Sequence, residues 1–243
     1  MYDYWLGGKD HFPADRDMAE RTAAILPDSP RLAQANRRFL GRAVRFLAER
    51  GVTQYIDLGT GLPTSPNVHE IARGVHPGAR VVYVDNDPMV VAHSRAMSTG
   101  GGVATVHADM REPEAILDHP DVAELLDFDQ PAALLMVAVL NYLTPGDDVR
   151  GLLGRYSARL ARGSYLALSV VSDEGLPGDV RRRARKLFQP SDIPANAWPR
   201  AAIDDLLTTI DPVRPGVTPT TRWRAEEDPL DTRMLAAVGT FRS

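Results

Sequence analysis

The sequence of 243 residues contains no cysteine. Disulfides, thiolate nucleophiles and zinc sites with Cys ligands are therefore excluded. The six histidines show no paired spacing typical of metal ligands, so we expect no metal site. They stand at positions 11, 69, 76, 93, 107 and 119. The absence of cysteine agrees with a reducing compartment, and we expect a cytoplasmic protein.

Long apolar runs and an excess of positive charge are also missing. No apolar run approaches the roughly 20 residues that cross a bilayer, and no basic segment followed by an apolar one opens the chain. The net charge of -4 gives no general reason to expect nucleic-acid binding. The basic run at 181–186 has no interleaved aromatic residues and is interpreted as a solvated helix face. Membranes are therefore excluded as partners, and nucleic acids are disfavoured.

Hydrophobic residues make up 44% of the chain, enough for one large folded unit. From residue 51 onward, apolar strands alternate with helical stretches, which predicts βαβ units around a mostly parallel sheet. We expect strands at 54–58, 80–84, 103–108, 132–139, 164–171 and 233–241. We expect helices at 65–74, 88–97, 113–117, 145–160, 179–187 and 199–207.

The first 50 residues have a different pattern. A short leader of 12 residues precedes two predicted helices, at 13–26 and 30–50. In the second helix, apolar residues such as Leu32, Phe39 and Leu47 recur at helical spacing. Residues 1–50 are thus expected to form a leader and helical cap, and residues 51–243 the core, within one domain 1–243. No internal repeat or linker divides the chain.

The most informative segment is 55–64, an apolar strand that runs into an acidic, glycine-containing turn. Gly59 and Gly61, with Thr60 between them, allow a ligand to approach the main chain. Asp57 adds a carboxylate, which would repel the pyrophosphate of a dinucleotide and attract the ammonium group of an amino-acid moiety. The loop therefore favours S-adenosylmethionine (SAM) over NAD as the cofactor.

Two further acidic positions follow the next predicted strands. Asp85 and then Asn86 end the second strand, where a carboxylate can accept hydrogen bonds from both hydroxyls of a ribose. Asp109 and Met110 follow the third strand. Asp109 could accept a hydrogen bond from the adenine amino group, and Met110 could pack on the adenine ring.

Together these three segments resemble the first three motifs of the class I SAM-dependent methyltransferases. The segments 2–10, 36–40, 61–64 and 215–223 are similar to the S-adenosyl methyltransferase family found mainly in actinobacteria. The resemblance implies SAM as cofactor and a Rossmann-like, seven-stranded, mostly parallel sheet, the class I methyltransferase fold, behind the N-terminal helical cap. Pro63 replaces the third glycine of the general loop. Members of the family carry residues before the Tyr-Asp-Tyr segment, so Met1 is expected to lie downstream of their usual start.

Residues that act on the acceptor are less well defined. The resemblance places Asn141 and Tyr142 near the transferred methyl group, although as plain sequence they are equally a strand end and a capped turn. The aromatic leader, including Tyr4, is suited to fold over a ligand as a lid. Tyr142, His11 and Tyr4 are candidate general bases that the sequence does not rank. Arg37 or Arg38 could pair with the SAM carboxylate or face solvent.

The predicted function is methyl transfer from SAM to a small-molecule acceptor by in-line displacement. The alternative is a SAM-binding sensor or regulatory protein without turnover. An NAD-dependent oxidoreductase is disfavoured by Asp57 and Pro63. The sequence is compatible with a homodimer and does not determine the oligomeric state.

Overall fold

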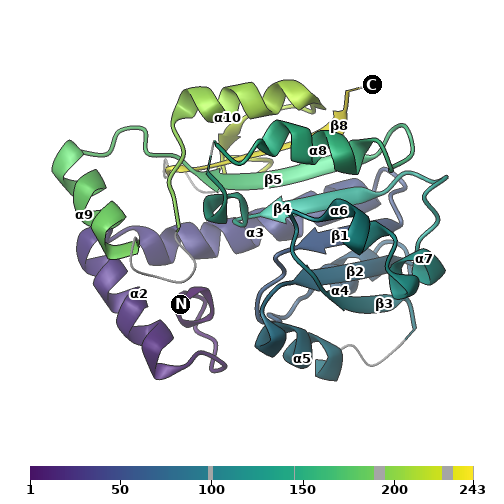
Figure 1. The fold of residues 1–243 in the computed structure, drawn as a ribbon, viewed down its shortest axis with the longest axis horizontal. Coiled ribbons are helices and arrows are strands. Elements are labelled where there is room, and N and C mark those ends of the chain that lie inside the picture. The colour runs from purple at the N-terminus through teal and green to yellow at the C-terminus, as the bar shows by residue number, and fades with distance from the viewer. Residues whose placement is uncertain (98–100, 145, 189–194, 226–231, 243) are drawn as a thin grey trace.

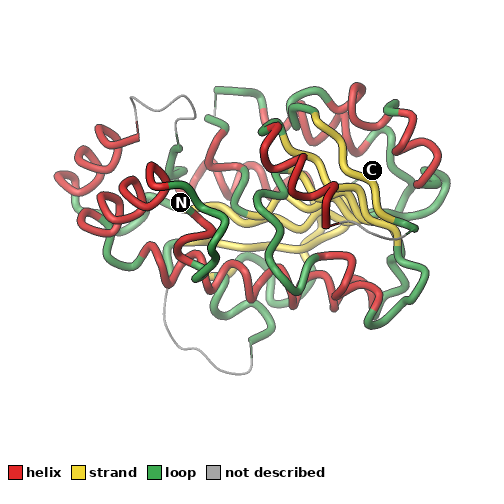
Figure 2. Tube along the Cα trace, turned by 90° about the horizontal axis from the view of Figure 1, so that it is seen from below, coloured by secondary structure: helices red, strands yellow, loops and turns green. Residues whose placement is uncertain are grey.

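A computed structural model describes residues 1–97, 101–144, 146–188, 195–225 and 232–242. Its centre is an eight-stranded sheet with helices on both faces, as Figure 1 and Figure 2 show. The strand order is β3-β2-β1-β4-β5-β8-β6, and β7 pairs with β8 beside that path. This architecture confirms the predicted α/β fold with a mostly parallel sheet.

The strands that were predicted from the alternating pattern form the parallel part of the sheet. They are β1 (Gln54–Leu58), β2 (Arg80–Asp85), β3 (Val103–His107), β4 (Ala133–Val137) and β5 (Tyr165–Val171). Neighbouring pairs among them are parallel. β4 ends two residues earlier than predicted, because Ala138 has a φ of 61° and leaves the extended conformation.

The last three strands are antiparallel additions. They are β6 (Ile210–Pro212), β7 (Thr218–Pro219) and β8 (Met234–Phe241). β8 inserts between β5 and β6 and runs antiparallel to both, as the prediction of a final strand requires. The seven strands of the continuous order match the predicted number, and the two-residue β7 adds an eighth. β6 and β7 are too short to produce an alternating pattern in the sequence.

The helices mostly follow the predicted boundaries. They are α1 (Tyr2–Trp5), α2 (Pro13–Ile25), α3 (Ser29–Ala48), α4 (Val68–Arg73), α5 (Pro88–Met97), α6 (Pro113–Leu117), α7 (Pro120–Leu125), α8 (Val149–Ser157), α9 (Gly178–Phe188) and α10 (Arg200–Leu206), with 3-10 turns η1 (Leu140–Tyr142) and η2 (Leu207–Thr209). Pro13, Pro88, Pro113 and Pro120 each open a helix, where a missing N–H costs nothing. α1 and α7 were not predicted, because four and six residues are too few for a helical period. A helix was predicted at 145–160. Residue 145 lies outside the described residues, and the helix in the structure begins at Val149.

The sheet is buried on both faces, so each parallel strand contributes to two hydrophobic clusters. Ile56 and Leu58 belong to one cluster, whereas Tyr55 belongs to the other. This explains why the strands are nearly continuous apolar runs. In the second cluster, Phe39 and Phe46 of α3 meet the ring of Trp223 edge to face, at centroid distances of 5.3 and 5.4 Å. α3 is thereby fixed along one face of the sheet.

The helical cap lies beside the carboxyl ends of the parallel strands. In Figure 1 the arrowheads of β1 and β4 point toward the side of the molecule that holds α1 and α2. α1 contacts both α2 and α3, and α9 contacts α2. The cap and the strand ends therefore border the same region.

The Trp223 contacts predict a large stability effect at one phenylalanine and a small one at another. Phe39 is fully buried, whereas Phe12 exposes 53% of its surface. We expect Phe39→Ala to lower the free energy of unfolding by about 3–5 kcal/mol, and the control Phe12→Ala to change it by less than about 1 kcal/mol. Urea unfolding followed by circular dichroism measures both. Equal losses in the two variants would show that the α3–Trp223 packing does not anchor the core.

Candidate functional site

The turn after β1 requires glycine at its first position. Gly59 has a φ of 65°, and a Cβ atom there would overlap the side chain of Val139, which follows β4. The N–H groups of Gly59 and Thr60 both donate to the carbonyl of Val84, at 2.8 and 3.2 Å. The turn is therefore held against the ends of both neighbouring strands, β2 and β4.

Asp57 lies at the base of this turn and exposes only 6% of its surface. The Thr60 hydroxyl donates a hydrogen bond to its carboxylate at 3.1 Å. The pKa of Asp57 is raised to about 7, chiefly by burial; the Thr60 hydrogen bond and the charge of Arg37 oppose the rise, and the charge of Asp85 adds a smaller contribution to it. Near neutral pH this carboxyl group is thus close to an equal mixture of its two forms, and a bound cation would stabilise the ionised one.

Asp85 joins the end of β2 to the glycine turn. One carboxylate oxygen accepts the N–H of Gly61 at 2.9 Å, and the other accepts the N–H of Asp87 at 3.0 Å. Burial is the largest effect on the pKa of Asp85 and raises it, while these N–H donors lower it. Each oxygen keeps a lone pair for a further donor. Asn86 has an exposed side chain, and its carbonyl accepts a hydrogen bond from His107 when that ring is protonated at Nε2 (3.1 Å).

Asp109 and Met110 follow β3, as predicted, but Asp109 already has a charged partner. The Nε–H of Arg111 donates to both carboxylate oxygens, at 2.9 and 3.0 Å, and a second guanidinium nitrogen adds a contact. Hydrogen bonding to Arg111 holds the pKa of Asp109 below its usual range. Met110 is half-buried, and its carbonyl accepts the hydroxyl of Tyr156 at 2.8 Å. The sequence analysis missed Arg111, whose only signal is its position two residues after Asp109.

Arg37 reaches from α3 to the segment that follows the glycine turn. Its guanidinium donates to the carbonyls of Thr64 and Pro66, the latter at 2.6 Å. Its positive charge also opposes the rise that burial causes in the pKa values of Asp57 and Tyr83. Arg37 is thus half-buried and bonded to the segment after the turn, and its pairing with the SAM carboxylate stays a prediction.

The leader folds around the buried carboxylate of Asp3. That carboxylate accepts the N–H of Asp10 at 3.2 Å and pairs with Nδ1 of His11 at 3.0 Å. A Cβ atom at Gly8 would overlap the same carboxylate, so the second glycine of the leader gives Asp3 its space. The ring of Tyr4 lies edge-on to His11 at 5.1 Å, and its hydroxyl donates to Glu20 at 3.2 Å. Tyr4 and His11, two of the candidate bases, are thus both engaged within the cap.

Asn141 and Tyr142 follow β4 in η1 and have different surroundings. The amide of Asn141 donates to the carbonyl of Asn196 at 2.6 Å and accepts the N–H of Val171 at 3.3 Å. It therefore joins the end of β5 to the segment that contains Asn196. Tyr142 exposes 46% of its surface. Burial of the phenol, the largest effect, and then the charges of Asp85 and Asp15 raise its pKa. The side chain is thus partly exposed, with its phenol enclosed by protein within electrostatic range of Asp85.

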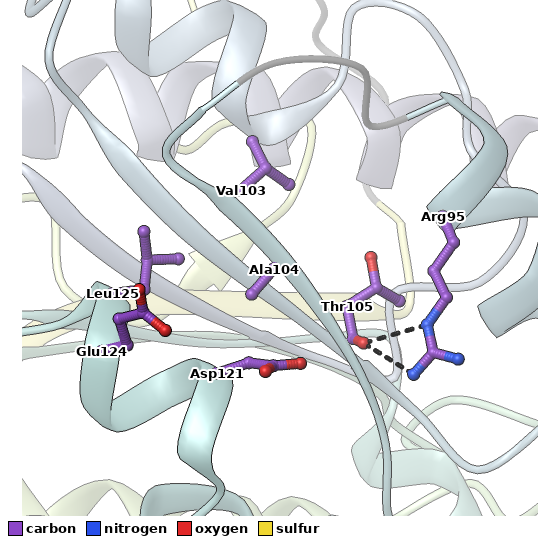
Figure 3. Close-up of a pocket in the computed structure, with 7 residues that line it drawn as sticks. All are labelled: Arg95, Val103, Ala104, Thr105, Asp121, Glu124 and Leu125. Atoms are coloured by element: carbon purple, nitrogen blue, oxygen red, sulfur yellow. Dashed lines mark hydrogen bonds between the residues drawn. The ribbon is translucent and has the colours of Figure 1, made fainter.

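A separate hollow lies at the outer edge of the sheet, along β3 (Figure 3). Its volume is about 430 Å³, and its lining includes Arg95, Thr105, Asp121 and Glu124. Arg95 donates through Nε and a terminal nitrogen to the carbonyl of Thr105, at 3.4 and 3.2 Å. The lining carries both signs of charge and contains none of the residues predicted to bind the cofactor. We therefore place the candidate site at the carboxyl edge and not in this hollow.

The described ranges contain neither a metal-binding cluster nor a membrane-spanning helix. No group of three or more His, Asp or Glu side chains in those ranges could hold a metal ion. Within the same residues, no helix has the length and apolar character needed to cross a membrane.

Comparisons with known proteins show the family of this chain. Residues 1–242 match the family model described as S-adenosyl methyltransferase. A DUF574 family protein of Streptomyces avermitilis is 37% identical, with a TM-score of 0.93 over 99% of this chain and 95% of that one. A protein of Thermobifida fusca assigned as a methyltransferase is 41% identical, with a TM-score of 0.90 over 100% of this chain and 93% of that one. No curated protein matches.

More distant structures share the fold alone. The N-methyltransferase NodS of Bradyrhizobium japonicum, solved with S-adenosylhomocysteine, is 13% identical, with a TM-score of 0.52 over 85% of this chain and 87% of that one. The family match spans almost the entire chain. The chain belongs to the S-adenosyl methyltransferase family and is a SAM-dependent methyltransferase with a Rossmann-like fold.

Proposed function

We propose that this enzyme binds SAM along the carboxyl edge of β1, β2 and β3 and methylates a small-molecule acceptor that approaches from the side of Tyr142. The observation that carries the proposal is the junction of the glycine turn with Asp57 and Asp85. The N–H of Gly61 donates to Asp85 at 2.9 Å, and the charge of Asp85 raises the pKa of Asp57. Two buried carboxyl groups thus flank one turn, where an open parallel sheet binds ligands.

The residues at this edge suit the parts of SAM. Asp57 is a buried carboxyl group with a raised pKa, and the ammonium group of the methionine moiety would supply the cation that stabilises its ionised form. Asp85 retains acceptor capacity for the two ribose hydroxyls. Gly59, Thr60 and Gly61 present backbone without bulky side chains. Asn86, Asp109 and Met110 would border the adenine, with Asp109 shared between the adenine amino group and Arg111.

When bound, SAM supplies a methyl group on a sulfonium sulfur, which is already activated for displacement. The protein therefore needs to align the acceptor and exclude water. We assign the orientation of the acceptor to Tyr142, because it is exposed and lies near Asp85. Asn141 would support the same turn through its bonds to Asn196 and Val171. Tyr4 would act through the leader, since its hydroxyl is bonded to Glu20.

A small molecule is the proposed acceptor, because the acidic net charge disfavours a nucleic acid. A structure of similar fold, the 1,6-didemethyltoxoflavin-N1-methyltransferase of Burkholderia thailandensis, holds bound 1,6-didemethyltoxoflavin and S-adenosylhomocysteine; it is 17% identical, with a TM-score of 0.51. A cytoplasmic location is proposed from the absence of cysteine.

Loss of the Asp85 carboxylate is expected to abolish tight cofactor binding. In calorimetric titrations with SAM and S-adenosylhomocysteine, we expect Asp85→Ala to weaken binding by at least about tenfold, because the ribose loses its acceptor and Gly61 its partner. Asp129→Ala removes the same charge from an exposed residue before β4, at the opposite edge, and should bind like the wild type. Failure of the wild-type protein to bind either compound, together with binding of NADH, would contradict the proposal.

The pKa of Asp57 predicts how binding depends on pH. Only the ionised carboxylate attracts an ammonium group, so the affinity for S-adenosylhomocysteine should rise from pH 5 to pH 7, by up to about tenfold per unit. Calorimetry at three pH values measures this slope. Asp57→Asn should bind weakly with a flat profile. An identical slope in wild type and variant would exclude Asp57 as the titrating group.

The same pKa predicts the opposite trend for the stability of the ligand-free protein. Because the folded state retains the Asp57 proton to about pH 7 whereas the unfolded chain loses it near pH 4, raising the pH through this window destabilises the fold. The loss is expected to reach about 4 kcal/mol at most. Urea unfolding of wild type and Asp57→Asn at pH 5 and pH 8 measures the part of this loss that falls above pH 5, about 3 kcal/mol, as the change in their stability difference. A difference that stays constant with pH would contradict the burial of this charge.

A further inference from the structure

A chain of hydrogen bonds links the leader to the turn after β4. The hydroxyl of Tyr2 donates to the carbonyl of Ala33 at 3.0 Å and accepts from Nδ2 of Asn36 at 3.0 Å. Oδ1 of Asn36 accepts the hydroxyl of Ser169 at 2.6 Å. The Ser169 oxygen in turn accepts the N–H of Ala138 at 2.9 Å. We call these residues the Asn36 chain.

The direction of every bond in the Asn36 chain is determined. Tyr2 has a single hydroxyl proton, which goes to Ala33, so the amide nitrogen of Asn36 must face Tyr2 and its oxygen must face Ser169. Asn36 exposes 1% of its surface and Ser169 none. Breaking one link therefore leaves a buried polar group without a partner, which favours this arrangement over others.

One end of the Asn36 chain holds a strained residue. Ala138 has a φ of 61°, in the left-handed region that is strained for an alanine. Its N–H is shared between the hydroxyl of Ser169 and the carbonyl of the same residue, at 2.9 and 3.2 Å. This turn leads directly into η1 and thus sets the position of Tyr142.

The other end holds the leader. Tyr2 belongs to α1, which packs on α2 and α3, and the buried Asp3 beside it organises residues as far as His11. Burial, the largest effect, raises the pKa of the Tyr2 phenol, and Arg37 and Tyr142 lie close enough to act on it electrostatically. Tyr142 is similarly affected by Asp85. The leader end of the Asn36 chain therefore lies within electrostatic range of Tyr142, which in turn lies within range of the carboxylate proposed to bind the ribose.

We propose that Asn36 is a positioning residue that locks the leader and the turn after β4 into one arrangement, and that this arrangement retains the bound cofactor. The proposal rests on the proposed function. An apolar side chain at position 36 would fill the space without the desolvation cost of the amide, so packing alone does not account for asparagine. The hydrogen bonds of the Asn36 chain hold Ala138 in its strained conformation and Tyr2 in its packed position at the same time. An apolar side chain could make contacts there but could not make these directed bonds.

The test compares three variants by the dissociation rate of S-adenosylhomocysteine in stopped-flow displacement. We expect Asn36→Leu and Tyr2→Phe each to speed dissociation by about tenfold, and the double variant to be no faster than either single one, because they break the same chain. Gln34→Leu is the matched control. Gln34 also lies on α3 and donates its amide to the leader, to the carbonyl of Trp5 at 3.3 Å, but it is exposed and outside the Asn36 chain. Its rate should stay within twofold of the wild type.

Hydrogen exchange on the ligand-free protein separates this proposal from the proposed function. We expect Asn36→Leu to raise exchange in residues 2–11 and in 138–142 together, while the amides of β1 and β4 stay protected. Unchanged exchange in both segments, or rate effects that multiply in the double variant, would overturn the role of Asn36. Absence of S-adenosylhomocysteine binding by the wild type, with the exchange result as expected, would overturn the proposed function and leave the coupling of the two segments intact. Tyr2→Phe keeps the ring and serves the same test if Asn36→Leu does not fold.

Discussion

The hydrogen bond from the Gly61 N–H to the Asp85 carboxylate is the interaction on which the site depends. It ties the turn after the first strand to the end of the second, and it needs a backbone that only glycine-rich sequence provides at this point. Gly59 allows the turn to lie against Val139, so the end of the fourth strand is fixed by the same packing. The ends of β1, β2 and β4 are thereby held in one arrangement before any ligand is present. A preorganised edge of this kind lowers the ordering cost of binding.

The second constraint is electrostatic. Asp57 and Asp85 are both buried, and the charge of Asp85 disfavours ionisation of Asp57. The positive charge of Arg37, which belongs to the helical cap, favours ionisation of Asp57 and so offsets part of this effect. The same guanidinium group holds the segment at Thr64 and Pro66 through hydrogen bonds. The site thus combines a rigid backbone with a carboxyl group that lacks full compensation. Such groups gather at functional sites, where a ligand supplies the missing charge.

Features that follow from local sequence were predictable, whereas those built from distant residues were not. Asp57 and Asp85 lie at the ends of apolar strands and Asp109 follows one, and the rule that parallel strands end at one edge was enough to predict that all three lie at the same edge. The Asn36 chain joins residues 34 and 133 positions apart, and no periodicity reports such contacts. Arg37 and Arg38 were equivalent in the sequence, because a helical pattern distinguishes buried from exposed faces but does not show which carbonyls a long side chain reaches. The pairing of Asp109 with Arg111 and the short strands β6 and β7 were not predicted, for similar reasons.

The contact of Arg95 with β3 affects whether another chain can pair with this edge of the sheet. β3 is the outermost parallel strand, and its outer edge offers backbone groups to any passing extended segment. By donating twice to the carbonyl of Thr105, Arg95 occupies the acceptor at the centre of that edge and sets a positive charge beside it. A second sheet could not extend this one there without displacing the guanidinium group. The helix that follows β2 therefore also protects the enzyme against edge-to-edge aggregation.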